Sequence, residues 1–257
     1  MKTWHASLLL LLVAALLTGC CGGVTQLGQL VREVKAKSIT PSDTIITDER
    51  TVSGFTGIDM RTFGRVVLTQ GDTESVTLTG SDNVVPLVKT TVQDGILVIE
   101  TEKTSIILNP TKENVLTCDI TVKDLKALTV SGAAEVEMES LTTSALAATM
   151  GGAGQIRLGQ LAATSIEIKV SGVGNVEVAG ESARATITIS GAGNVNAPDL
   201  KCQTAEITIS GLGNATVWVT DQLTGDIKGG GSVSYYGDPK TNTKTSGLGS
   251  FKALGSK

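Results

Sequence analysis

The chain has 257 residues and a formal net charge of −4, and 40% of its residues are hydrophobic while only 3% are aromatic. This composition provides neither a basic face for phosphates nor an array of rings for stacked bases, so nucleic acid is not expected as a partner. Thirty glycines and five prolines indicate many short strands joined by tight turns, which predicts an all-β fold with an aliphatic core.

The first residues have the features of an export signal. Lys2 precedes an uninterrupted apolar run over residues 8–17, and Leu17-Thr18-Gly19-Cys20 follows. Because ten helical residues span only ~15 Å of a ~30 Å bilayer core, residues 1–19 are interpreted as a signal peptide rather than a membrane span. The segment ending at Cys20 resembles the lipobox of bacterial lipoproteins, in which the cysteine is lipid-modified. An ordinary cleaved signal with a coincidental cysteine is the alternative.

A lipid on Cys20 would place the protein outside the cytoplasm, anchored to the membrane of the cell envelope. We expect the outer membrane, at either its periplasmic face or the cell surface. The sole histidine, His5, lies within the signal. The mature chain therefore lacks the base of a Ser-His-Asp or Cys-His system and the imidazole of a zinc site. We expect neither an enzyme nor a bound cofactor or metal.

The remaining sequence falls into three parts. Residues 20–49 show no sustained hydrophobic period and are predicted to be a tether between membrane and domain. Residues 50–125 are predicted to form less regular β-structure, with strands at 66–69, 75–79 and 96–100, the last after an Asp94-Gly95 turn. Residues 126–257 carry a repeat and are predicted to form the regular part of the fold.

The repeat is a Gly-rich segment, as in Ser171-Gly172-Val173-Gly174-Asn175. Its first glycines recur at intervals of 20, 20, 19, 20, 18 and 18 residues, which suits one coil of a β-solenoid. The glycines that we expect at the coil corners are Gly132, Gly152, Gly172, Gly191, Gly211, Gly229 and Gly247. We expect a sharp corner there to demand either positive φ or close backbone approach, both of which favour glycine.

When the repeats are aligned on these glycines, most aligned positions are either consistently aliphatic or consistently polar. Positions two before, four after and six after the glycine are mostly aliphatic, whereas those three before and five after are mostly polar. Alternation with period two on both sides of the corner predicts one strand on each side, with the first set facing inward. In the last coil the inward positions include Thr243 and Thr245, with Lys240 and Lys244 nearby, which predicts a polar cap or an oligomer contact.

Three sets of side chains are candidates for function. Asn175, Asn194 and Asn214 share a column and are expected to form a hydrogen-bonded polar ladder, although they could instead bind a polar ligand. Calcium is disfavoured because these turns lack the aspartate of the calcium-binding nonapeptide repeat.

Glu137 and Glu177 could be a catalytic carboxylate pair, but Arg157 lies between them in the same column, which favours a surface charge ladder. Cys118 and Cys202 are separated by about four rungs, or ~19 Å, too far for a disulfide. Both are therefore expected to be unpaired. Residues 101–116 and the Asp119, Asp124 pair are the remaining places where a catalytic cleft could lie.

Several segments together resemble one known family. They are residues 50–55, 66–72, 94–99 and the Ser-Gly-x-Gly-Asn-Val repeats. This combination, in order over about 50–254, resembles the autotransporter adhesin head GIN domain family, which includes many lipoproteins of Gram-negative bacteria. The resemblance implies a right-handed parallel β-helix at the cell envelope that could be a homo-oligomer, and it brings no catalytic residues.

We therefore expect a non-enzymatic envelope lipoprotein that acts as an adhesin-like interaction or scaffold module, with a protein or glycan partner. The alternative is a carbohydrate-active β-helix protein that binds or cleaves polysaccharide.

Overall fold

The computed structural model describes residues 39–101 and 116–257. The chain divides into two units, Met1–Ser38 and Ile39–Lys257, and the fold described below is that of the second. The predicted signal peptide, Cys20 and most of the predicted tether lie outside the described residues. Among the described residues, no helix is both long and apolar enough to cross a membrane.

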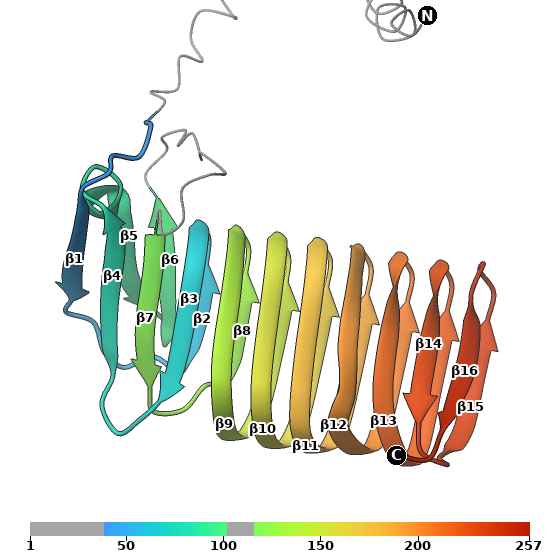
Figure 1. Ribbon diagram of the computed structural model, residues 1–257. Coiled ribbons are helices and arrows are strands. Elements are labelled where there is room, and N and C mark those ends of the chain that lie inside the picture. The colour runs from blue at the N-terminus through green and yellow to red at the C-terminus, as the bar shows by residue number, and fades with distance from the viewer. Residues whose placement is uncertain (1–38, 102–115) are drawn as a thin grey trace, which may run out of the picture. The chain divides into compact units, whose positions relative to one another are not determined.

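The body is a single 16-stranded sheet wound into a solenoid (Figure 1). Its regular coils consist of β8 (Ala127–Val130), β9 (Ala133–Met150), β10 (Ala153–Val170), β11 (Val173–Ile189), β12 (Ala192–Ile209) and β13 (Leu212–Ile227). Each of β9 to β13 pairs in parallel with the next. The predicted parallel solenoid with coils of about twenty residues is confirmed.

The strands differ from the prediction in length. We expected one strand on each side of a Gly-rich corner, but β10 runs over 18 residues from one corner to the next. The chain bends within the strand, and the pairing of β10 with β11 shifts in register between Leu158 and Leu161. A bend of this kind leaves the ladder of backbone hydrogen bonds largely continuous, because the neighbouring coils bend at the same place.

The core is formed by the predicted inward columns. In the column two before the corner glycine, Val130, Met150, Val170, Ile189, Ile209 and Ile227 are each 0% exposed. Four after the glycine, Val136, Ile156, Val176, Val195, Ala215 and Val233 are at most 1% exposed. A fully buried aliphatic side chain contributes about 1.5 to 3 kcal/mol, so these columns stabilise the stack as a whole.

The last coil departs from this pattern. β14 (Gly230–Tyr236) and β15 (Lys240–Thr245) form the last full coil, on β13, and β16 (Ser250–Gly255) starts a further rung on β14. Every residue of β15 is exposed, and so is Ala253 in β16, whereas Phe251 packs partly against the core. The expectation that Thr243 and Thr245, and Ala253 six after Gly247, face inward is wrong, because no further described coil covers this end. Lysines on the open strands hinder pairing with another edge.

The N-terminal part continues the same stack, but its rungs do not follow chain order. It contains β1 (Ile45–Arg50), β2 (Gly57–Met60), β3 (Phe63–Gln70), β4 (Ser75–Ser81), η1 (Val85–Leu87), β5 (Val88–Gln93), β6 (Ile96–Thr101) and β7 (Leu116–Val122). β2 pairs with β8 and β3 with β9, so these two strands form the rung next to the regular coils. β6 and β7 form the rung beyond them.

Beyond the rung of β6 and β7, β4 and β5 reverse the strand direction, and β1 at the edge returns to the direction of the coils. β4 pairs antiparallel with β7, β5 pairs antiparallel with β6, and β1 adds to β4 as an antiparallel edge. The predicted Asp94-Gly95 turn joins β5 to β6, with φ of 51° and 75°, as expected of a tight hairpin. The predicted strands at 66–69, 75–79 and 96–100 are all present.

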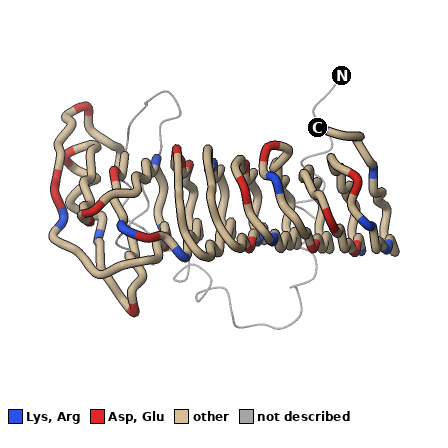
Figure 2. Tube along the Cα trace, turned by 90° about the horizontal axis from the view of Figure 1, so that it is seen from below, with Lys and Arg blue, Asp and Glu red and all other residues tan. Residues whose placement is uncertain are grey.

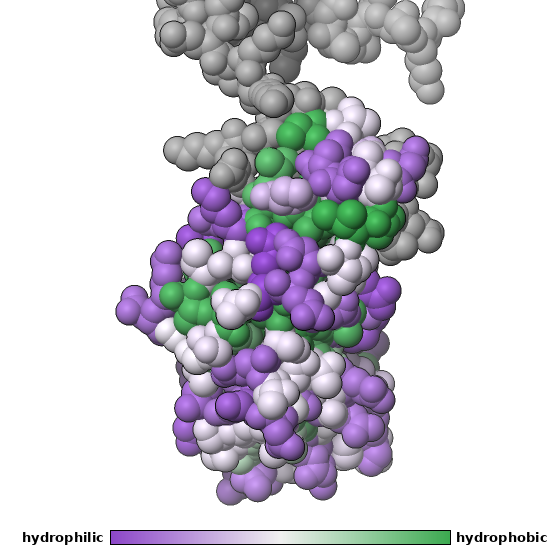
Figure 3. Space-filling model, turned by 90° about the vertical axis from the view of Figure 1, so that its left-hand side faces the viewer, coloured by the Kyte–Doolittle hydropathy of each residue, from purple (hydrophilic) through white to green (hydrophobic). Residues whose placement is uncertain are grey.

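The structure also shifts the boundary of the predicted tether. Residues 45–49 belong to β1, where Thr47 is opposite Thr79 and their hydroxyl oxygens lie 3.2 Å apart. The end of the stack that carries β1, β4 and β5 shows apolar side chains between polar ones (Figure 3). Ile45 is 51% exposed at this end, so a weakly covered edge strand, rather than a flexible linker, begins the body.

Candidate interaction surfaces

The predicted corner glycines stand one above another along the stack. A Cβ on Gly152 would lie 1.9 Å from the carbonyl oxygen of Gly132, and a Cβ on Gly172 would lie 1.9 Å from that of Gly152. The same relation continues through Gly191, Gly211, Gly229 and Gly247 at 2.0 to 2.2 Å. None of these seven glycines has a positive φ, so close backbone approach between coils, not turn conformation, is the reason for glycine here.

A second file of glycines lies two residues further along each corner. A Cβ on Gly193 would lie 2.2 Å from the carbonyl oxygen of Gly174, and one on Gly213 would lie 1.9 Å from that of Gly193. The Gly-x-Gly pattern is visible in the sequence, but the close approach at its second glycine becomes clear only from the structure. The two files together leave one edge of the stack without side-chain bulk at these positions.

The three asparagines lie beside the second file and are bonded to one another. Asn194 Nδ2 donates to Asn175 Oδ1 at 3.1 Å, and Asn214 Nδ2 donates to Asn194 Oδ1 at 3.1 Å. Asn194 Oδ1 also accepts from the backbone N–H of Asn214, as Asn214 Oδ1 does from that of Ser232, both at 3.1 Å. The ladder therefore uses much of its own hydrogen-bonding capacity, which leaves fewer groups for a ligand.

A shallow hollow of about 470 Å³ follows the asparagine ladder. Its outer wall is a ridge formed by the residue that comes directly after each corner glycine. On this ridge Val173 is 64% exposed, Leu212 68% and Leu248 92%. Apolar side chains of this size in a line are unusual on a polar surface, although one alanine separates Val173 from Leu212 and one glycine separates Leu212 from Leu248.

The carboxylates of Glu137 and Glu177 are tied to arginine rather than to each other. Arg157 contacts Glu137 at 3.0 Å and Glu177 at 3.1 Å, and Arg65 of β3 contacts Glu137 at 2.6 Å. The Arg65 hydrogen bond is the main cause that lowers the pKa of Glu137. This four-residue charge ladder was recognised from the sequence except for Arg65, which lies outside the repeats.

Charged residues of both signs are spread along the coils, and uncharged residues occupy most of the trace (Figure 2). Asp124 accepts from the Thr143 hydroxyl at 2.7 Å and lies 3.5 Å from Lys126. Within the described residues, no group of three His, Cys, Asp or Glu side chains could hold a metal ion. Most of the 101–116 segment, named above as a possible cleft, lies outside the described residues.

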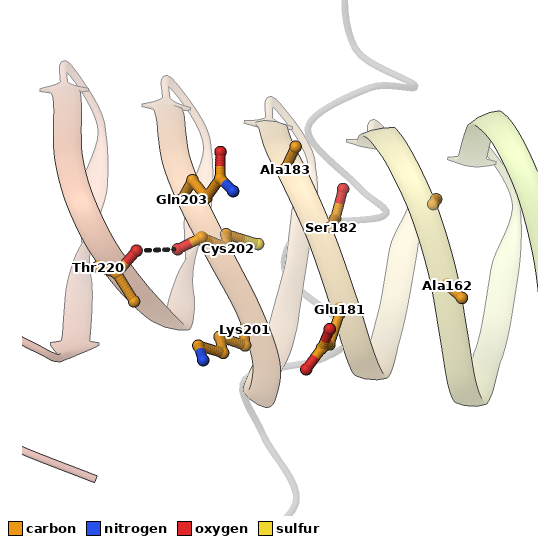
Figure 4. A pocket seen from close by; sticks show the side chains of 9 residues that line it. Ala162, Glu181, Ser182, Ala183, Lys201, Cys202, Gln203 and Thr220 are labelled. Atoms are coloured by element: carbon orange, nitrogen blue, oxygen red, sulfur yellow. Dashed lines mark hydrogen bonds between the residues drawn. The ribbon is translucent and has the colours of Figure 1, made fainter.

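Cys118 and Cys202 are both free, as predicted, and both are buried. Burial raises the pKa of each thiol to about 12, with a further contribution at Cys118 from nearby Asp119. Cys202 lines a hollow of about 330 Å³ on the outer surface of β10 to β13 (Figure 4). Glu181, Lys201 and Gln203 surround this hollow, and Thr220 Oγ1 donates to the Cys202 carbonyl at 3.3 Å.

Comparison with known families decides what kind of protein carries these features. Residues 54–239 match the family described as "Putative auto-transporter adhesin, head GIN domain". The chain belongs to this family. The matched region comprises the reversed N-terminal rungs and the glycine files as far as β14, so the head GIN domain is the solenoid itself. No curated protein matches the sequence.

Solved structures with the same fold support this assignment. A "putative adhesin" from Bacteroides fragilis is 28% identical, with a TM-score of 0.80 over 84% of this chain and 100% of that one. A "putative adhesin" from Parabacteroides merdae is 20% identical, with a TM-score of 0.64 over 84% and 99%. A "putative lipid binding protein" from Parabacteroides distasonis is 22% identical, with a TM-score of 0.59 over 85% and 100%. The last two show the fold alone.

Proposed function

We propose that this head GIN domain protein is a non-enzymatic, adhesin-like interaction or scaffold module of the cell envelope, anchored by a lipid on Cys20. The observation that carries the proposal is the solenoid itself. Its flat faces present Thr188, Thr208 and Thr216 between buried neighbours, and repeated flat surfaces of this kind suit extended contact with a partner. Membership of an adhesin family supports an adhesin-like role at a surface or extracytoplasmic location.

Polysaccharide cleavage is the less favoured alternative. A glycosidase requires two carboxyl groups that flank a bound sugar, with one free to donate a proton and the other to act as base or nucleophile. Glu137 and Glu177 instead share the guanidinium of Arg157. Release of reducing ends from acidic or neutral polysaccharides by the purified chain would contradict the proposed function.

The proposed function is tested in two steps. Bacterial cells that express the full chain are labelled with a palmitate analogue, and the expected label on the protein should disappear in Cys20→Ala. Those cells are then measured for retention on surfaces coated with extracellular matrix, mucin or other bacteria. We expect more retention than with cells that lack the chain, and equal retention on every surface would overturn the adhesin-like role.

A further inference from the structure

Aromatic side chains are scarce in this chain, yet three of them lie at one place. The whole sequence has two Trp, two Tyr and three Phe. Trp218, Tyr235 and Tyr236 occupy adjacent strands, and Trp218 is directly opposite Tyr236 in the pairing of β13 with β14. The low aromatic content of the sequence does not indicate that these three lie on neighbouring rungs.

Strand alternation directs two of these rings outward. Val217 and Val219 are 2% and 0% exposed, so Trp218 between them lies on the outer face of the strand. Tyr235 packs partly against the core, and Tyr236 therefore faces outward beside Trp218. Both outward rings are half-buried and stand one rung, or ~4.8 Å, apart. Trp218 and Tyr236 together form an aromatic platform.

Lysines approach this platform. Lys201 Nζ lies 5.6 Å from the centroid of the Trp218 ring. Lys257 Nζ lies 5.5 Å from the Trp218 centroid and 5.3 Å from that of Tyr236. Lys257 also contacts the Pro198 carbonyl and the Asp199 carboxylate. Lys257 follows β16 and belongs to none of the described strands, so its flexible side chain can leave the rings without disturbing a coil.

The coil itself is irregular at this point. The pairing of β12 with β13 shifts between Ala197 and Lys201 and again between Cys202 and Thr204. As a result Lys201 is opposite Trp218. Lys201, which lies over the Trp218 ring, also lines the hollow of about 330 Å³, together with Glu181, Gln203 and Thr220. A volume of this size is at the lower end of the range of ligand pockets, and in Figure 4 Lys201 and Glu181 project from neighbouring coils at its margin.

We propose that the aromatic platform and this hollow form a saccharide-binding subsite, which takes the apolar face of a pyranose ring on Trp218. Trp and Tyr provide a large apolar surface with a polar edge. The ammonium of Lys201, the amide of Gln203 and the carboxylate of Glu181 are donors and acceptors for sugar hydroxyls. The inference rests on the proposed function and names the class of partner, and it includes no cleavage step.

The competing explanation is that the lysines and rings only fasten the C-terminus. The two explanations differ for Lys257→Ala. If the cluster only holds the C-terminus in place, this variant is less stable and binds no sugar. If the cluster is a saccharide subsite, the variant binds sugar at least as tightly as the parent, because a competing side chain has been removed. Trp218→Ala removes the platform in both cases, but only the subsite loses a ligand.

The test is a binding titration with the purified chain. Trp218 is the sole tryptophan after residue 4, so its fluorescence reports directly on the platform. One arm uses neutral cello-, malto- and chito-oligosaccharides, and the other uses uronate-containing oligosaccharides. Because Trp218→Ala lacks this fluorescent reporter, isothermal titration calorimetry measures its binding.

We expect saturable binding in at least one arm, a loss of affinity of tenfold or more in Trp218→Ala, and unchanged or tighter binding in Lys257→Ala. Leu212→Ala is the matched control, because Leu212 is an exposed apolar residue of the same strand, at its first position beside the Gly-rich corner. Its affinity should equal that of the parent, and thermal melts verify that all variants are folded.

No binding in either arm, or equal binding by Trp218→Ala, would overturn the subsite. Cell retention assays with the same variants separate this outcome from failure of the proposed function. Retention of cells without saccharide binding would overturn the subsite and leave the adhesin-like role. Saccharide binding without retention of cells would overturn the adhesin-like role and leave the subsite.

Discussion

The stacking of corner glycines leads to a prediction that two adjacent positions of one corner can test. In Gly152→Ala the new Cβ would meet the Gly132 carbonyl oxygen at 1.9 Å and the Ser131 carbonyl oxygen at 2.7 Å. In Gly151→Ala the nearest atom is the Val130 carbonyl oxygen at 3.6 Å, an ordinary contact. Neither position has a positive φ. The two variants therefore differ only in the approach of the neighbouring coil.

The size of the effect follows from the hydrogen bonds of this corner. Gly151 and Gly152 donate to the Val130 carbonyl at 2.8 and 2.9 Å, and Ala153 donates to the Gly132 carbonyl at 2.9 Å. A Cβ on Gly152 forces the two coils apart by about an ångström, and loss of three such bonds at about 0.5 to 1.5 kcal/mol each costs roughly 1.5 to 4.5 kcal/mol. Gly151→Ala should be neutral, or more stable by up to about 1 kcal/mol through reduced entropy of the unfolded chain.

Urea unfolding followed by far-ultraviolet circular dichroism measures both variants. A parallel curve from the fluorescence of Trp218, three coils away, shows whether the stack unfolds as one unit. If Gly152→Ala and Gly151→Ala have the same unfolding free energy within about 0.5 kcal/mol, close approach between coils is not what requires glycine, and the reasoning fails.

Three further predictions concern single side chains. Asn194→Ala should lower the free energy of unfolding by about 1 to 2 kcal/mol, because it removes side-chain bonds to both neighbouring rungs at an exposed site; an unchanged urea midpoint would mean that the ladder contributes nothing. The buried thiols of Cys118 and Cys202, with pKa values of about 12, should not react with Ellman's reagent at pH 8 until urea is added; prompt reaction of the folded chain would contradict their burial. Because the pKa of Glu137 is lowered in the folded chain, its contribution to stability is complete above the pKa of the unfolded carboxyl and is lost as pH falls through the folded value. Arg65→Gln should therefore flatten the acid side of the stability curve measured by urea titration at several pH values, and an unaltered curve would show that this hydrogen bond is not responsible.

The regular half of the fold could be predicted from the sequence because one constraint recurs in every coil. A side chain at Gly172 or Gly191 would collide with the coil before it, so the spacing of these glycines records the register of the stack. The same register places Val176 and Val195 inside and predicts that Asn175 and Asn194 meet.

The N-terminal rungs could not be predicted in this way. Their partners are separated along the chain by other strands, as when Phe63 of β3 lies opposite Ala133 of β9. No spacing in the sequence encodes that relation, since hydrophobic alternation specifies the face of a strand but not its neighbour. The salt bridge between Arg65 and Glu137 was missed for the same reason.

The contact of Lys201 with the aromatic platform was missed because it depends on an irregularity. Trp218 and Tyr236 themselves share one column, seven residues after Gly211 and Gly229. Aligned on the corner glycines alone, Trp218 of β13 falls opposite Pro198 rather than Lys201. The register shift in the pairing of β12 with β13 brings Lys201 to Trp218. A departure from the repeat is invisible to an alignment that assumes the repeat, and in this chain it coincides with the hollow beside Cys202.

Because of the reversed strands at the N-terminal end, the two ends of the solenoid differ in whether another coil can be added. β4 and β5 run opposite to every regular coil, and β1 at the edge of β4 returns to the direction of the coils. A duplicated twenty-residue unit added at this end would therefore meet an antiparallel partner at β5. At β15 and β16 the direction is still parallel, and one more unit could be added to the same ladder. Longer and shorter relatives should therefore differ in the number of units near their C-terminal ends, with the reversed end kept constant.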